Sequence, residues 1–411
     1  MYAASFQVRL SEAMVDKQPE MEYQVMKTLL QIWKDKFIHE NMSRKDIIKC
    51  TLMHGYIIFV LISVFLPIVF EDDIKVMLEI LVPVFTLVES LSCYYPFLVY
   101  RKEYFAIMRD FQMFYEKHKH QPAYRQLIQT CDGNASSMVR IFRVGLGACV
   151  VLVPAYPALK HALQAGPRRV EPPVAAYYPV EIGEPANLII TYTSQCVCCY
   201  FMQSICLSNI SAPIYYFMAV VAHFQVTRQK FKEIEDAKDS QQALHLQRCA
   251  VRTHQQTLNF LRRVQRVGSA SYFILISCAA IGYSFAFFQL ASTDDLATII
   301  YYAQFSAGLS SHTFLLCYYG QKVIDEINAL TFSIYSVPWY RYNAGVTRSL
   351  VLSLSRAQGT APVHAWKFAT VSLITFQSVR LLLYQLPLHG FFIDVNECHV
   401  TISRFGINSA L

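Results

Sequence analysis

Residues Tyr319–Tyr342, YGQKVIDEINALTFSIYSVPWYRY, mark the place where a long apolar segment changes to acidic and aromatic residues. The apolar segment before them, 297–320, has the length of one bilayer crossing, because a helical span needs about 20 mostly apolar residues. The segment that follows, 323–356, is only moderately apolar and carries charged side chains of both signs. It therefore predicts a pair of helices outside the lipid, directly after a membrane span.

The whole chain of 411 residues has the composition of an integral membrane protein. Apolar residues make up 54% and charged residues 16%, whereas charged residues make up about 25% of an ordinary soluble domain. We therefore predict an all-α membrane protein with seven transmembrane helices. Their expected ranges are 47–70, 76–99, 140–160, 188–222, 267–290, 297–320 and 366–388. The fourth is too long for one crossing, so we expect it to project into water at one end.

Positive charges gather in the loops after the second and fourth spans, and this bias sets the expected orientation. The loop after the fourth span carries Lys and Arg residues from Arg228 to Arg266, whereas the loop after the fifth span has Asp294 and Asp295 and no cation. Cytoplasmic loops are enriched in Lys and Arg, so we expect a cytoplasmic N-terminus and an extracellular C-terminus. This topology is opposite to that of G-protein-coupled receptors.

Residues 21–38, MEYQVMKTLLQIWKDKFI, place apolar side chains about four positions apart, with lysines between them. This spacing is typical of an amphipathic helix that lies in the inner membrane interface. A cytosolic helix packed on the rest of the protein fits the pattern nearly as well.

The sequence has no nucleophile motif, phosphate-binding loop or zinc-ligand spacing. We therefore expect no enzymatic activity, no metal, no cofactor and no nucleic-acid partner. His118 and His120 fall in a charged loop, where we expect them to be solvated.

Ordered motifs near the end of the chain resemble a known receptor family. The run LCYYGQKVIDEINALTFSIYSVPWYRY (316–342) combines a Tyr-Gly pair at the end of the sixth span, an acidic helix and a Tyr-x-x-x-Trp-Tyr set. The motifs LSRAQ (354–358) and KFATVSLITFQSV (367–379) follow it. These residues are similar to the C-terminal signature of insect odorant receptors. The inverted topology, the length and the long basic loop after the fourth span agree with that family.

The resemblance implies a ligand-gated, non-selective cation channel in the plasma membrane of an olfactory sensory dendrite. It also implies a heterotetramer in which tuning subunits bind the odorant and a shared co-receptor supplies the other subunits. The co-receptor carries an insertion after the fourth span, and this chain is short there, so it looks like a tuning subunit. The expected parts are a cytoplasmic segment (1–46), six helices with the odorant pocket in their outer half (47–320), cytoplasmic anchor helices (321–362), a pore-lining helix (363–390) and an atypical tail (391–411).

The family resemblance places the odorant pocket among the outer halves of spans 2 to 6. The candidate ligand-binding residues at those ends are Met77, Leu81, Phe85, Val88, Tyr156, Tyr192, Gln195, Phe285, Phe288, Tyr301, Tyr302 and Phe305. These side chains are uncharged and mostly apolar or aromatic, which favours a small, volatile, mostly neutral ligand. Glu89 is an exception, because a carboxylate inside a span is a functional candidate; Arg143 or a tyrosine hydroxyl is its expected partner. The proline-rich loop 161–187 is either a lid over the pocket or a plain surface loop.

In the family, the cytoplasmic ends of spans 4 to 6 and the segment before span 7 hold the subunits together. The resemblance therefore implies anchor roles for Asp325, Glu326, Tyr335, Trp339 and Tyr340. Large aromatic side chains with a polar group suit an interface. The acidic pair is expected to meet the basic side chains of Arg262, Arg263 and Arg266. Packing within a single subunit is the alternative.

The last helix lines the pore in the family, which implies pore-lining roles for Phe376, Val379 and Leu383. From Arg380 onward the match to the family stops. We hypothesise that the residues after Val379 come from a misread final exon or from translated intron sequence. If they are real, Arg380 in a cation pore and Pro387 within its helix put conduction in doubt.

Other membrane proteins remain as alternatives. A gustatory-type chemoreceptor channel shares the topology but differs in its signature near the last helix. A G-protein-coupled receptor becomes the better interpretation if the N-terminus lies outside the cell. A secondary transporter is disfavoured because the sequence shows no internal repeat.

Overall fold

The computed structural model describes residues 40–70, 74–163, 172–174, 176–177 and 184–388. The helices in this part of the chain are α3 (Arg44–Phe70), α4 (Ile74–Val99), α5 (Arg101–His118), α6 (Pro122–Leu163), α7 (Pro185–Lys232), α8 (Ser240–Ser292), α9 (Leu296–Ser336), α10 (Ala344–Gln358) and α11 (Leu373–Leu388). The connections include 3-10 helices η1 (Glu233–Asp236) and η2 (Trp339–Arg341) and the two-residue strands β1 (His364–Ala365) and β2 (Ala369–Thr370). The N-terminal helix expected at 21–38 and the tail 391–411 lie outside the described residues.

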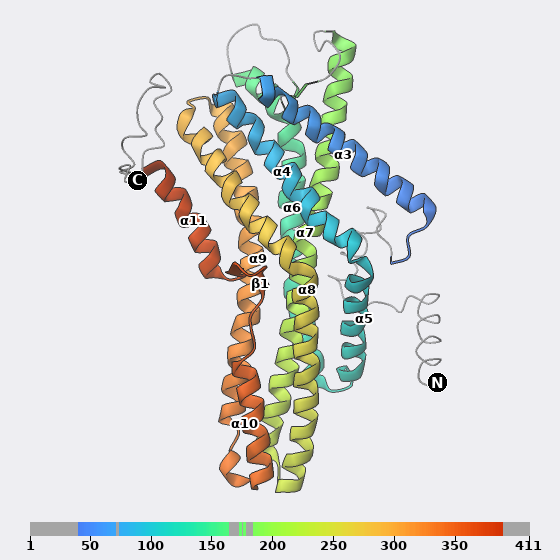
Figure 1. The fold of residues 1–411 in the computed structure, drawn as a ribbon, viewed down its shortest axis with the longest axis vertical. Helices are drawn as coiled ribbons and strands as arrows, with labels where there is room; N and C mark the ends of the chain where they lie inside the picture. Colours follow the sequence, from blue (N-terminus) through green and yellow to red (C-terminus); the bar gives the residue numbers. More distant parts are fainter. Residues whose placement is uncertain (1–39, 71–73, 164–171, 175, 178–183, 389–411) are drawn as a thin grey trace, which may run out of the picture.

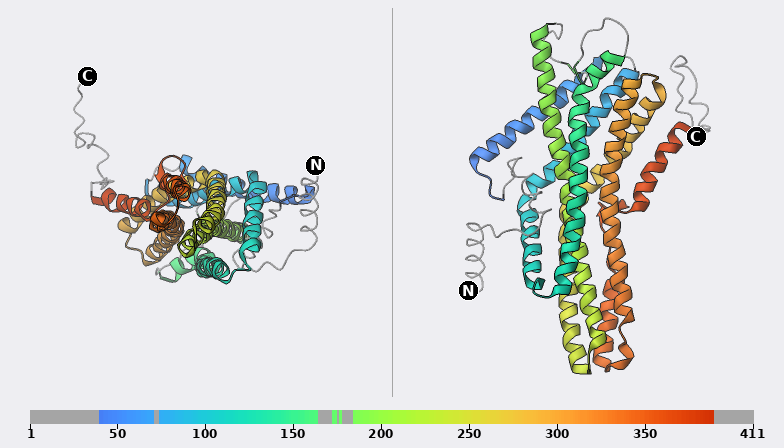
Figure 2. Two further views of the ribbon diagram at one scale, coloured as in Figure 1. Left: turned by 90° about the horizontal axis from the view of Figure 1, so that it is seen from below. Right: turned by 180° about the vertical axis from the view of Figure 1, so that it is seen from behind.

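Three long helices, α7, α8 and α9, run side by side along the whole molecule (Figure 1). Helices α3, α4 and α6 surround their upper part, and the lower part continues as a narrower stalk that includes α10 (Figures 1 and 2). The ends of α3, α6 and α8 lie at the top, whereas the α7–α8 and α9–α10 connections lie at the bottom. Successive spans therefore alternate in direction, as the sequence predicts.

The predicted spans before the last fall within α3, α4, α6, α7, α8 and α9. By length and apolar composition, four stretches of the described residues qualify as membrane spans: Arg44–Pro67, Pro122–Ala162, Pro185–Asp236 and Ser240–Ser292. Pro83–Val99 forms a shorter apolar helix. The total of seven spans and the sidedness of the termini remain predictions.

The expected first helix of the pair at 323–356 is not a separate element. Helix α9 continues unbroken from Leu296 to Ser336, so the expected boundary at 320/321 lies inside a helix. The break comes at Val337 and Pro338, because the residue before a proline avoids the α conformation. After the break come the short 3-10 helix η2 and then α10, the separate α-helix of this region.

The seventh predicted span also begins later than expected, at Leu373 rather than residue 366. The residues before it form the β1–β2 pair, in which His364 is opposite Thr370 and Ala365 is opposite Ala369. Trp366 in the turn has a φ of 53°, which no helix accommodates. Apolar composition alone did not reveal this turn.

Polar side chains begin three of the helices in the way that their sequences favour. Asp239, Asp295 and Asn343 each accept a hydrogen bond from the backbone N–H three residues later, over 2.7, 3.1 and 3.1 Å. Such capping satisfies backbone donors that have no partner within the helix. These residues therefore set the first turns of α8, α9 and α10.

The middle of α7 is the centre of the molecule. Ile210, Ala212, Ile214 and Phe217 are completely buried, which requires neighbouring helices on every side. A helix that is apolar all round is the expected sequence for such a position. The upper part of α7 faces the cavity described next.

Candidate ligand cavity and subunit contacts

A cavity of about 180 Å³ lies between α3, α4, α6, α7 and α9. Its walls come from the end of α3, the beginnings of α4, α7 and α9, and the second half of α6. These are the halves of the helices that the sequence predicts to face outward. The wall is mostly apolar, with a small number of polar side chains, which is the usual composition of a small-molecule site.

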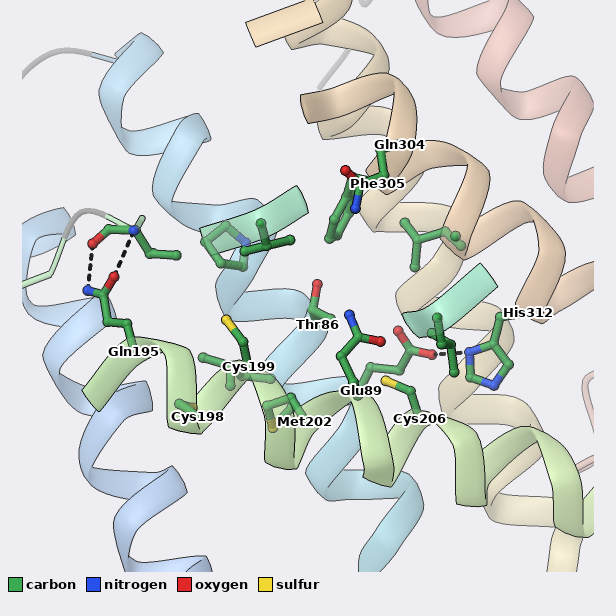
Figure 3. Close-up of a pocket in the computed structure, with 18 of the residues that line it drawn as sticks. Thr86, Glu89, Gln195, Cys198, Cys199, Met202, Cys206, Gln304, Phe305 and His312 are labelled. Atoms are coloured by element: carbon green, nitrogen blue, oxygen red, sulfur yellow. Dashed lines mark hydrogen bonds and ion pairs between the residues drawn. The ribbon is translucent and has the colours of Figure 1, made fainter. Parts of the chain in front are cut away.

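Gln195 of α7 connects the wall to the segment between α6 and α7. Its amide donates to the Val174 carbonyl over 2.8 Å and accepts from the Val174 N–H over 2.9 Å (Figure 3). Val174 itself lines the cavity, and Tyr177 N donates to Ser63 O of α3 over 2.7 Å. The described part of the connecting loop is therefore tied to the bundle beside the cavity.

Three of the candidate ligand-binding residues lie on the cavity wall: Gln195, Tyr301 and Phe305. Tyr156 packs on one of them, with its ring centroid 4.6 Å from that of Tyr301, and its hydroxyl lies 3.2 Å from Thr298 Oγ1. Tyr156 thus supports the wall from behind rather than lining it.

The other candidates are not among the residues that line the cavity: Met77, Leu81, Phe85, Val88, Tyr192, Phe285, Phe288 and Tyr302. Phe85 and Phe285 instead pack on each other between α4 and α8, with centroids 5.4 Å apart. Tyr302 is buried beside Ala286 of α8, and the Tyr192 hydroxyl donates to the Pro154 carbonyl.

On α4 the wall is a different stripe from the expected one. Pro83, Thr86 and Leu87 line the cavity, whereas Val88 is 37% exposed. One residue along a helix turns the side chain by about 100°. Since α4 is apolar on several faces, its sequence does not show which face meets the cavity.

Glu89 also lines the cavity, and its partner is a histidine. Glu89 Oε1 lies 3.3 Å from His312 Nδ1 of α9 (Figure 3), and the two residues are 4% and 6% exposed. The expected partners, Arg143 or a tyrosine hydroxyl, are therefore wrong. A histidine inside an apolar span was the available signal in the sequence, and Glu89 was the only member of the pair that we predicted.

The residues expected to anchor the subunits lie at the lower end of α9 and in η2. Tyr335, Trp339 and Tyr340 are 66%, 49% and 70% exposed, and an exposed group of large aromatic rings is typical of a contact surface. Glu326 instead binds within its own chain, 3.5 Å from Arg228 and 2.8 Å from the Gln225 amide.

The expected pairing of the acidic residues with the basic stretch 262–266 is therefore wrong for Glu326. Arg263 pairs with Glu103 and Asp110, which lie on α5. Asp325 accepts a hydrogen bond from Gln321 over 2.9 Å. Glu326, Asp325 and Arg263 are therefore all paired within this chain.

Helix α11 begins beside β1, at the middle of the molecule, and runs obliquely upward and away from α9 (Figure 1). Its Phe376 ring lies 5.5 Å from Phe314 of α9, Val379 is 6% exposed and Ile374 is 73% exposed. Val379 thus packs within the chain, and the side chain of Leu383 lies outside the described part.

The segment before α11 is fixed to two neighbouring helices. The Gln265 amide of α8 donates to His364 O and accepts from His364 N, both over 2.8 Å. Val371 lies directly against Gly320 of α9, where any side chain would overlap its backbone. These contacts connect the position of α11 to that of α8 and α9.

His118 is buried rather than solvated, with 4% of its surface exposed. Its Nδ1 lies 2.7 Å from the Phe114 carbonyl, and the Phe114 ring packs against it at a tilt, with the centroids 4.4 Å apart. Burial disfavours the charged imidazolium and lowers the pKa of His118 to about 4. The local charge of the segment concealed this burial, because the adjacent Glu116 and Lys117 are exposed whereas His118 is on the buried face of α5.

Comparisons with known proteins agree with this geometry. A family model described as 7tm Odorant receptor matches residues 73–384. Odorant receptor 2a of Drosophila melanogaster is 23% identical over 126 residues, and Putative odorant receptor 92a of the same organism is 26% identical over 132 residues. Each alignment covers 32% of the relative. The first covers 31% of this chain and the second 32%. The aligned stretch thus spans about a third of the length of these curated relatives.

Solved structures show the same fold. The insect olfactory receptor OR5 from Machilis hrabei in complex with eugenol matches with a TM-score of 0.74 and 14% identity, over 89% of this chain and 99% of that chain. The structure described without that compound matches with a TM-score of 0.70 and 16% identity, over 89% and 96%. The predicted all-α membrane-receptor fold is thereby confirmed, and membership of a receptor family agrees with the prediction that the chain is not an enzyme. The chain belongs to the 7tm odorant receptor family.

Proposed function

We propose that this chain is the odorant-binding, tuning subunit of a ligand-gated, non-selective cation channel. The observation that carries the proposal is the cavity of about 180 Å³ between five helices. A mostly apolar space of this size suits one compact volatile molecule. Its few polar groups favour a mostly neutral ligand.

The partner in this proposal is a co-receptor subunit, with which the chain forms a heterotetramer in the plasma membrane of a sensory dendrite. The exposed rings of Tyr335, Trp339 and Tyr340 support a subunit contact at the stalk. Asp325 and Glu326 shape that stalk through contacts within their own chain. Phe376, Val379 and Leu383 belong to the helix that we assign to the pore wall.

Co-expression of the chain with an insect odorant co-receptor and recording of membrane currents over a broad panel of volatiles tests the proposal. We expect currents that require both subunits. The variant Gly308→Phe should abolish them, because Gly308 lines the cavity and the space next to its Cα is open among the described residues. Gly55→Phe, at an exposed glycine of α3 outside the cavity wall, is the matched control. Silence of the complex on the cell surface towards the whole panel would refute the proposal.

A further inference from the structure

Polar groups gather at one end of the cavity, where three helices meet. Glu89 comes from α4, Gln203 from α7 and His312 from α9, and all three line the cavity. A contact of 3.3 Å between Ser90 Oγ and Cys206 Sγ joins α4 and α7 beside them. Figure 3 shows Glu89, Cys206 and His312 together on one side of the cavity, with Gln195 on the other.

The hydrogen-bonding capacity of this end is only partly used. Gln203 Oε1 and His312 Nε2 are both buried, and neither has a hydrogen-bond partner among the described residues. Glu89 lies 3.3 Å from His312 Nδ1, which leaves capacity for further donors, because a carboxylate accepts about four hydrogen bonds. Gln195, by contrast, is fully engaged with the Val174 backbone. The unused groups are therefore mainly acceptors.

A ligand that supplies a donor matches this end best. A hydroxyl offers one O–H donor and two acceptor lone pairs. Its O–H can donate to the Glu89 carboxylate or to Gln203 Oε1. An ether, ester or ketone brings acceptors only, so it would leave the buried Gln203 oxygen unpaired.

From these groups we infer that the receptor is selective for ligands with one hydroxyl group, an alcohol or a phenol on a compact apolar skeleton. This inference rests on the proposed function, because it names the ligand class of the same cavity. An ammonium group fits less well, since its charge must leave water to enter a mostly apolar cavity. Glu89 and His312 act here as specificity-determining residues.

Matched pairs of compounds test the inference in the co-expressed complex. The probes are 1-hexanol, 2-phenylethanol and geraniol, each beside its O-methyl ether, which keeps the skeleton and removes the donor. We expect at least one alcohol to activate at a concentration about ten-fold or more below that of its ether. Ethers that are as potent as their alcohols would overturn the inference.

The variant Glu89→Gln tests the residue assignment. It keeps the size of the side chain and removes the carboxylate, so the advantage of the alcohol over its ether should fall about ten-fold. Tyr95→Phe, on the same helix but 67% exposed and outside the cavity wall, is the control and should keep the advantage. A ratio of alcohol to ether potency that Glu89→Gln leaves unchanged would refute the role of Glu89.

Thermal unfolding of the purified chain in detergent separates this inference from the proposed function, because it does not depend on gating. Stabilisation by an alcohol and less stabilisation by its ether, without any current, would support the ligand class and refute the channel proposal. Currents of equal size with the alcohol and with its ether would support the channel proposal and refute the ligand class. If neither the alcohols nor the ethers stabilise the chain or evoke a current, both are refuted.

Discussion

Replacement of Gly320 by alanine tests whether the approach to α11 depends on contact with α9. A Cβ atom at position 320 would lie 2.7 Å from Val371 Cγ1 and 3.0 Å from the Val371 carbonyl carbon, and it would overlap the carbonyl oxygen. The backbone of Val371 is not free to move away, because its N–H donates to Val363 O over 2.9 Å. The added methyl group must therefore displace the whole segment before α11.

The expected cost follows from two opposing effects. Overpacking of a well-packed site costs about 1–3 kcal/mol, and contact with backbone atoms places Gly320→Ala near the upper end of that range. Alanine gains about 1 kcal/mol over glycine in a helix interior. The net loss of stability should thus be about 2 kcal/mol. Gly55→Ala, where the added Cβ meets no described atom within 4 Å, should instead be neutral or stabilising by up to about 1 kcal/mol.

The assay is thermal unfolding of the purified subunit in detergent, together with odorant-evoked current after co-expression. We expect Gly320→Ala to unfold at a lower temperature and to give smaller currents at an unchanged half-maximal ligand concentration, because residue 320 does not line the cavity. If Gly320→Ala behaves like Gly55→Ala in both measurements, the close contact between α9 and the α11 approach is not a requirement of the fold.

Three further substitutions test other parts of the structure. Burial lowers the pKa of His118 from 6.5 to about 4. Between these pH values the unfolded chain binds more protons than the folded chain, so the free energy of unfolding should fall by about 2 kcal/mol from pH 7 to pH 5. In thermal unfolding, His118→Gln should lose that part of the pH dependence, and an unchanged pH dependence would contradict the burial. Gln265→Met leaves the backbone N–H and C=O of His364 without their side-chain partner. It should lower the free energy of unfolding by about 2 kcal/mol in the same assay. A variant as stable as the wild type would show that this link is dispensable. Trp339→Ala should reduce the tetramer fraction in size-exclusion chromatography with the co-receptor but not the stability of the single subunit, because Trp339 is 49% exposed. Tyr177→Ala, at an exposed residue near the opposite end of the chain's helices, is the control. Equal tetramer fractions for the two variants would refute the anchor role.

The sequence predicted the helical membrane fold because each span carries its own apolar run, and those runs coincide with α3, α4, α6, α7, α8 and α9. The predictions that failed depended on neighbours. The turn at Trp366 is held by Gln265, ninety-nine residues from His364 along the chain, and nothing in the local composition reveals it. The unbroken α9 was missed because charge was taken as a sign of a boundary, although Glu326 is accommodated by Arg228.

The cavity was only partly predictable for a similar reason. Tyr301 and Phe305 lie one turn apart near the start of α9, so topology alone placed them near the wall. For α4, which faces α3, α7 and α8, an apolar stripe fits several faces, and Phe85 packs on Phe285 instead of facing the cavity. His312 was missed because its role depends on Glu89, a residue on another helix. Polar pairs between helices become visible only when the helices are packed.

The most direct test of the account is the position of a bound ligand. A cryo-electron microscopy map of the chain assembled with its co-receptor, in the presence of an activating volatile, should show ligand density inside the cavity between α4, α7 and α9. The account predicts that this density touches Tyr301 and Phe305 and reaches the Glu89–His312 pair. An empty cavity, with the activating ligand bound elsewhere on the chain, would contradict it.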